Sequence, residues 1–111
     1  MDKQINKFLQ DILEATNSID SFIQGFRLSD YQKSKLVRRA VERELTIIGE
    51  AMNTLMKLEK NIPITTGRKI ISFRNLITHA YNSVNDETTW VIITRHLPIL
   101  KSEVESLLNI E

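Results

Sequence analysis

The stretch LVRRAVERELTIIGEAMNTLM, residues 36–56, decides the fold class, because its apolar residues recur at intervals of three and four. This spacing gathers them on one stripe of an α-helix. A capping box formed by Ser29 and Gln32 precedes the stretch and provides a helix start. We therefore predict one long helix from about residue 29 to about residue 60.

The same periodicity predicts a helix before this stretch and two after it. The first helix ends near Gly25, a residue that suits a helix C-terminus. Pro63 then breaks the chain, and Thr65 or Thr66 can cap a third helix that runs from about residue 68 to residue 80 or 81.

Asn85 can cap the fourth helix, in which Pro98 is expected to cause a kink. Its apolar stripe is Trp90, Ile93, Leu97, Leu100, Val104 and Leu107. The sequence has no strand alternation and no internal repeat. It predicts a single domain over residues 1–111, with an all-α fold built as an antiparallel bundle of four main helices.

The composition excludes several classes of protein. Without cysteine, the chain can form neither disulfides nor thiolate metal sites, and its two histidines belong to no cluster of metal ligands. The net charge of +1 does not by itself indicate a nucleic-acid-binding protein. The sequence shows neither an apolar run of roughly 20 residues nor a signal peptide. We expect a cytoplasmic protein that has no metal, no other cofactor and no membrane contact.

The third helix contains FRNLITHAYN, residues 73–82, whose polar residues are unusual for a solvated face. A helical wheel places Arg74, Asn75, Thr78 and His79 on one side, and Tyr81 follows Arg74 by seven residues. The opposite, core side of the wheel holds Phe73, Leu76, Ile77 and Ala80. Arginine can bind phosphate oxygens through two hydrogen bonds, and histidine transfers protons near neutral pH. Acid–base chemistry that needs two proton transfers has only one imidazole on this face of each chain. A symmetric dimer would supply a second imidazole.

Periodicity alone nevertheless favours a structural role for this helix face. In that interpretation Arg74 pairs with an acidic residue, His79 caps or packs, and Tyr81 lies at the edge of the core. The residue types suggest a phosphate site without establishing one.

The stretch FRNLITHAY resembles the R-x4-H-x-Y signature of HEPN-domain proteins, in which asparagine follows the arginine. It is most similar to the HepT toxin branch, whose members accompany MntA-type nucleotidyltransferase antitoxins. RAVERELTIIGEA (39–51) is similar to the second-helix pattern of that branch, and NSVNDETTWVIITRHLPIL (82–100) fits its last helix.

This resemblance implies an all-α homodimer with the motif face at the cleft between protomers. It also implies a toxin with metal-independent endoribonuclease activity, in which Arg74 and His79 are catalytic and Asn75 and Thr78 support them. The RNA 2′-hydroxyl would attack the adjacent phosphorus and leave a 2′,3′-cyclic phosphate. The partner nucleotidyltransferase would adenylylate Tyr81 and so block RNA.

Three features of the long helix each have two interpretations. Glu50 supports the motif by pairing with Arg74, or it is an ordinary surface carboxylate. Gly49, which costs up to about 1 kcal/mol relative to alanine, marks a close helix contact or a tolerated weak position. The basic run KSKLVRRAVER (33–43) guides RNA or is a solvated face.

Two other functions stay open at this point. One is a non-catalytic HEPN module that binds nucleotide or a partner nucleotidyltransferase, and the other is a helical dimerisation protein. The intact arginine, histidine and tyrosine favour the nuclease, because a pure adaptor has no need of a proton-transfer residue.

Overall fold

The computed structural model describes residues 3–80, 82 and 84–109, and every regular element in that part of the chain is a helix. The all-α fold class is therefore confirmed. In chain order the elements are α1 (Lys3–Phe22), α2 (Leu28–Lys33), α3 (Lys35–Leu58), α4 (Gly67–His79), α5 (Asp86–Val91), the π-helical segment η2 (Ile92–His96) and α6 (Leu97–Leu108). None of these helices combines the length and the apolarity needed to cross a membrane.

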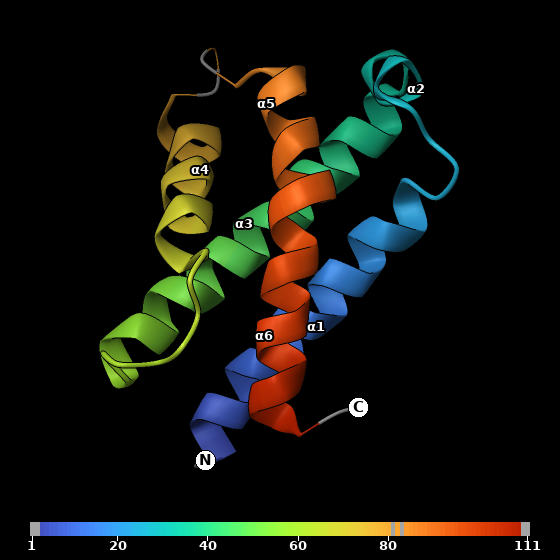
Figure 1. The fold of residues 1–111 in the computed structure, drawn as a ribbon. Helices are drawn as coiled ribbons and strands as arrows, with labels where there is room; N and C mark the ends of the chain where they lie inside the picture. Colours follow the sequence, from blue (N-terminus) through green and yellow to red (C-terminus); the bar gives the residue numbers. More distant parts are fainter. Residues whose placement is uncertain (1–2, 81, 83, 110–111) are drawn as a thin grey trace.

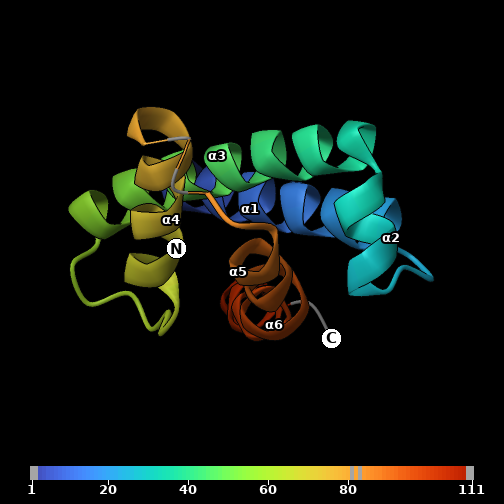
Figure 2. The same cartoon turned by 90° about the horizontal axis from the view of Figure 1, so that it is seen from above.

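The two longest helices, α1 and α3, run antiparallel and form one layer (Figure 1). Seen from above, the continuous rod of α5, η2 and α6 forms a second layer, and α4 stands beside that rod and crosses α3 (Figure 2). The core lies between them, and it confirms most of the apolar stripes predicted from periodicity. Leu36, the first residue of the stripe predicted for the long helix, is an exception, because it is 81% exposed. The most buried members of the core include Leu9, Ile12, Ile19, Leu45, Ile48, Met52, Leu55, Ile70, Ile93, Leu97 and Leu100.

The prediction of one unbroken second helix is wrong at its start. The helix is divided at Ser34, whose hydroxyl oxygen accepts a hydrogen bond from the Val37 amide at 3.2 Å and thereby caps α3. The short α2 begins after Arg27 rather than at a capping box on Ser29. There the Asp30 carboxylate accepts a hydrogen bond from the Arg27 amide at 2.8 Å. A charged acceptor satisfies the first turn better than a neutral one.

The turn after α1 and the start of α5 lie at the residues predicted for them. Gly25 has a φ angle of 78°, in the left-handed region that glycine tolerates, and it lies in the turn after α1. Asn85 caps α5, because its side-chain oxygen accepts a hydrogen bond from the Thr88 amide at 3.0 Å. Pro98 lies in the first turn of α6, directly after the π-helical turn η2, so its missing amide donor falls where the helical hydrogen-bond pattern changes.

The loop before α4 is attached to α6. The Thr65 amide donates to both carboxylate oxygens of Glu103, at 3.0 and 3.2 Å. Thr66 occupies the N-cap position of α4, but its buried hydroxyl has no partner among the residues described and does not cap the helix. The cap predicted from the two threonines is therefore correct in position only, and the side chain of Glu103 fixes the loop instead.

One aromatic pair joins the ends of α2 and α5. The ring of Tyr31 is fully buried, and its centroid lies 5.6 Å from that of Trp90 at an interplanar angle of 40°. Its hydroxyl is buried, and it has no hydrogen-bond partner in residues 3–80, 82 and 84–109. Burial, followed by the nearby Glu42 carboxylate, raises the pKa of the Tyr31 phenol well above its ordinary value, so the group stays neutral.

Candidate functional site

The motif occupies the C-terminal end of α4, which emerges from the body of the protein. Ile70 and Phe73 are buried in the first part of the helix, but Leu76 is 37% exposed. Figure 2 shows that this end projects past α3 on the side away from α5 and α6. The helical wheel predicted Leu76 on the core side, and that prediction is wrong because α4 extends beyond the helices that could cover it.

Arg74 is the motif residue that packs against the body. Its stem crosses Gly49 of α3 so closely that a Cβ added to Gly49 would lie 2.7 Å from Cγ of Arg74 and closer still to its Cβ. The close-contact interpretation of Gly49 is thus confirmed. The Nε atom of Arg74 is buried, and none of the residues that the structure describes accepts a hydrogen bond from it. Because the residue as a whole is only half-buried and its guanidinium carries a permanent charge, Arg74 is suited to bind an anion.

The remaining motif residues of the described chain face solvent. Asn75, Thr78 and His79 are all exposed, whereas Arg74 is half-buried. The Thr78 hydroxyl donates to the carbonyl oxygen of Arg74 at 2.9 Å, so its proton is engaged in a hydrogen bond within α4. The structure therefore separates Arg74, which borders the buried stripe of α4, from Asn75 and His79 on the outer face. Tyr81 lies outside the described residues.

Glu50 lies on a different side of α3 from Gly49, where Arg74 of α4 makes its contact. It is exposed and lines a surface hollow together with Phe8 and Asp11 of α1. No ion pair between Glu50 and Arg74 occurs within the part of the chain that the structure describes. This placement favours the interpretation of Glu50 as a surface carboxylate.

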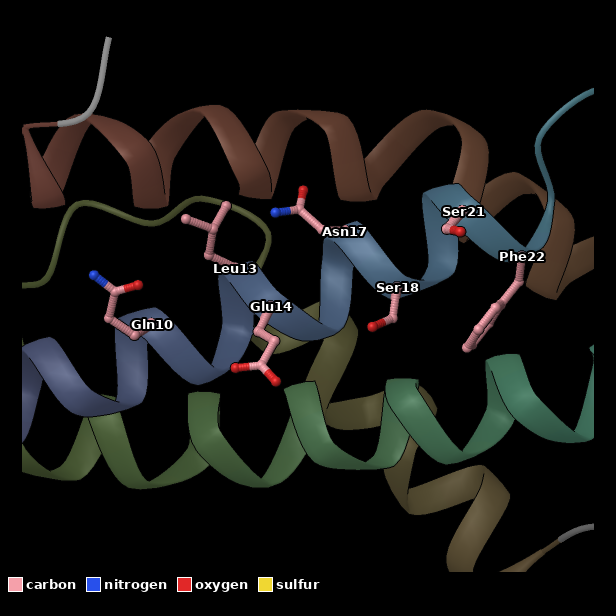
Figure 3. Close-up of a pocket in the computed structure, with 7 residues that line it drawn as sticks. All are labelled: Gln10, Leu13, Glu14, Asn17, Ser18, Ser21 and Phe22. Carbon is pink, nitrogen blue, oxygen red and sulfur yellow. The ribbon is translucent and has the colours of Figure 1, made fainter.

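A second hollow follows the exposed flank of α1 (Figure 3). Its lining residues are Gln10, Leu13, Glu14, Asn17, Ser18, Ser21 and Phe22. They all come from one helix and provide neither an arginine nor a histidine. This hollow lacks the side chains that phosphate chemistry requires, and the candidate site stays at the end of α4.

The second histidine, His96, is half-buried in η2. Burial holds its pKa below the ordinary range, and the positive charges of Lys69 and Arg95 act in the same direction. A neutral, partly buried imidazole suits a structural role. Within the described residues, no three His, Cys, Asp or Glu side chains gather to hold a metal ion.

These features define an all-helical domain in which α4 carries an arginine, whose Nε has no partner in the described part of the chain, and an exposed histidine five residues later. A family model for ribonuclease HepT-like proteins matches residues 12–107. The chain therefore belongs to the ribonuclease HepT-like family, as its resemblance to HEPN-domain proteins predicted. The enzymes of this family are ribonucleases.

Relatives cover nearly the whole chain. A protein of Thermococcus cleftensis named "Probable ribonuclease HepT" is 32% identical over 111 residues, which span 96% of this chain and 98% of that protein. A "Putative RNase" of Methanocaldococcus jannaschii is 30% identical over 93% of this chain and 95% of its own length. Another "Putative RNase", from Caldanaerobacter subterraneus, is 30% identical over 94% of both. No solved structure matches the chain.

Proposed function

We propose that this protein is a toxin ribonuclease that cleaves RNA without a metal ion, with Arg74 and His79 as its catalytic residues. The observation that carries the proposal is that one helix holds both Arg74, whose buried Nε has no hydrogen-bond partner among the described residues, and an exposed histidine, His79. RNA cleavage by the purified protein in EDTA tests it. The same protein without such activity would be a non-catalytic module that binds nucleotide or a partner nucleotidyltransferase.

In this mechanism the RNA 2′-oxygen attacks the adjacent phosphorus while the bond from phosphorus to the 5′-oxygen breaks. The products are a 2′,3′-cyclic phosphate and a free 5′-hydroxyl group. A base takes the proton of the 2′-hydroxyl, and an acid delivers a proton to the leaving 5′-oxygen. His79 performs one of these transfers. The Arg74 guanidinium stabilises the charge that develops on the phosphoryl oxygens, and Asn75 orients one of the reacting groups.

The active form is a homodimer in which two motif faces meet. The exposed Leu76 next to the site supports this arrangement, as does the need for a second proton-transfer group. Light scattering is expected to give twice the 12.9 kDa mass of the chain. Leu76→Asp is expected to shift the protein toward the monomer and to reduce cleavage. A monomeric mass at protein concentrations that still cleave RNA would contradict the dimer.

The toxin is neutralised in the cytoplasm by an MntA-like nucleotidyltransferase that transfers AMP to Tyr81. An AMP group adds charge and bulk beside the site and would exclude RNA. After co-expression with the partner enzyme and ATP, mass spectrometry is expected to find AMP on the peptide that contains Tyr81. The second tyrosine, Tyr31, is fully buried and serves as an internal control that stays unmodified.

Tyr81→Phe provides the matching variant for this experiment. It is expected to keep its ribonuclease activity in the presence of the partner enzyme. If cleavage is suppressed while the Tyr81 peptide carries no AMP, neutralisation has another cause, such as simple occlusion of the site by the partner.

A further inference from the structure

A row of three basic side chains lies on α3, outside the motif. Lys35, Arg39 and Arg43 follow one another at intervals of four residues, so they share one stripe with about 6 Å of axial rise between neighbours. All three are exposed. We refer to Lys35, Arg39 and Arg43 as the α3 basic row.

The positive charge of the chain is concentrated around this row. Residues 33–43 contain five basic residues and one acidic residue, Glu42, which gives this segment a charge of +4. Because the whole chain has a net charge of +1, the other 100 residues together carry −3. A polyanion therefore meets a positive surface here even though the protein is nearly neutral.

Two members of the row are available for an external anion. The guanidinium of Arg39 lies 3.4 Å from the carboxylate of Glu42. Because Glu42 is only 7% exposed, Arg39 helps to balance a buried charge. Lys35 and Arg43 form no ion pair with any residue that the structure describes. Arg39 thus has a structural partner, whereas Lys35 and Arg43 do not.

The position of the row relates it to the motif. The core residues of α3, such as Val41 and Ile48, lie on the opposite side of the helix, so the row points away from the core. The end of α4 projects past α3 on the side away from α5 and α6 (Figure 2). Arg43 precedes Gly49 by six residues, or about 9 Å along the helix axis, and Gly49 is where Arg74 touches α3. One rigid helix therefore links the row to the site.

We infer that the α3 basic row binds the phosphate backbone of the RNA that this protein cleaves, and that it does so chiefly through Lys35 and Arg43. The inference rests on the proposed ribonuclease function. Phosphate contacts of this kind position a strand without reading its sequence, and they weaken as salt rises. They supply the binding that the small site at the end of α4 does not supply by itself.

The test compares two double variants of the full chain, each made in a His79→Ala background so that RNA stays intact during binding. Lys35→Gln/Arg43→Gln removes the two unpaired charges of the row and keeps Arg39 with its partner. The matched control, Lys57→Gln/Lys60→Gln, removes two exposed charges from the opposite end of α3 and the loop after it. Affinity for a fluorescent single-stranded RNA is measured over a range of salt concentrations.

Loss of two phosphate contacts is expected to reduce the slope of log affinity against log salt by about 1.4, which corresponds to about 25-fold weaker binding at 0.1 M salt. The control is expected to keep the slope of its parent. In the active protein, the row variant is expected to raise KM rather than to lower kcat. Equal slopes in the row variant and the control would overturn the inference.

Cleavage by the unsubstituted protein is measured in parallel and separates the two proposals. If it cleaves RNA and the row variant binds like the control, the ribonuclease stands and the row is rejected. If it does not cleave RNA but the row variant still loses slope, the row is supported and the ribonuclease is rejected. Absence of RNA binding by every protein rejects the row, and absence of cleavage as well rejects both proposals.

Discussion

His79→Ala is expected to lower the rate of RNA cleavage in EDTA by about a hundredfold to ten-thousandfold, the usual contribution of a positioned acid or base. The side chain is exposed at the end of α4, so its removal leaves the core intact. Arg74→Ala is expected to cost about a hundredfold to a thousandfold through lost charge stabilisation. Arg74→Lys restores the charge without the forked geometry and should recover only part of the activity. Each rate is measured on one labelled RNA under single-turnover conditions.

The matched control for this experiment is His96→Gln, which replaces the other histidine of the chain. His96 is half-buried in η2, and we expect its variant to cleave RNA at the rate of the unsubstituted protein. Circular dichroism confirms that each variant is folded. If His79→Ala and the unsubstituted protein cleave equally fast, the assignment of His79 as a catalytic residue is wrong.

Gly49→Ala is expected to destabilise the protein and to reduce cleavage, although glycine to alanine normally strengthens a helix by about 1 kcal/mol. The added Cβ would overlap the first side-chain atoms of Arg74, which cannot move unless α4 moves. We expect the free energy of unfolding to fall by about 1–3 kcal/mol, as in other overpacked contacts. Urea denaturation measures this change. Cleavage is then measured where the variant is fully folded, so that a residual loss reports the displaced guanidinium.

Gly67→Ala is the matched substitution in the same pair of helices. Its Cβ would meet the terminal methyl group of Met52 at 2.7 Å and the sulfur of Met56 at 3.2 Å, and these flexible ends can shift. The variant is expected to lose less stability than Gly49→Ala and to retain cleavage. A Gly49→Ala protein that is as stable and as active as Gly67→Ala would show that the contact with Arg74 does not position the site.

Most of the helices could be predicted because apolar periodicity is a local property of the chain. The stripes that include Ile12, Leu45 and Leu100 are buried as expected. The division at Ser34 was missed because no apolar residue lies between Tyr31 and Leu36, so periodicity is silent there. The capping hydrogen bond to Val37 marks the break. Periodicity reports the face of a helix, and it carries no information about which cap forms.

The site could be predicted in its residues but not in its arrangement. A helical wheel treats every turn of α4 as equally covered, so it could not reveal that Leu76 lies beyond the neighbouring helices. It also placed Arg74 with His79, although the contact with Gly49 draws Arg74 toward α3. The glycine inside a long helix was the one signal of that contact, because only close packing compensates for its low helix propensity.

The packing of Trp90 against Tyr31 provides the protein with a natural optical probe. The chain contains a single tryptophan, so its ultraviolet emission comes from one known place, at the junction of α2 and α5. That junction lies directly after the segment that connects α4 to the last helical rod. Events at this end of the molecule can therefore be followed by intrinsic fluorescence, without attaching a dye to a protein that has no cysteine to label.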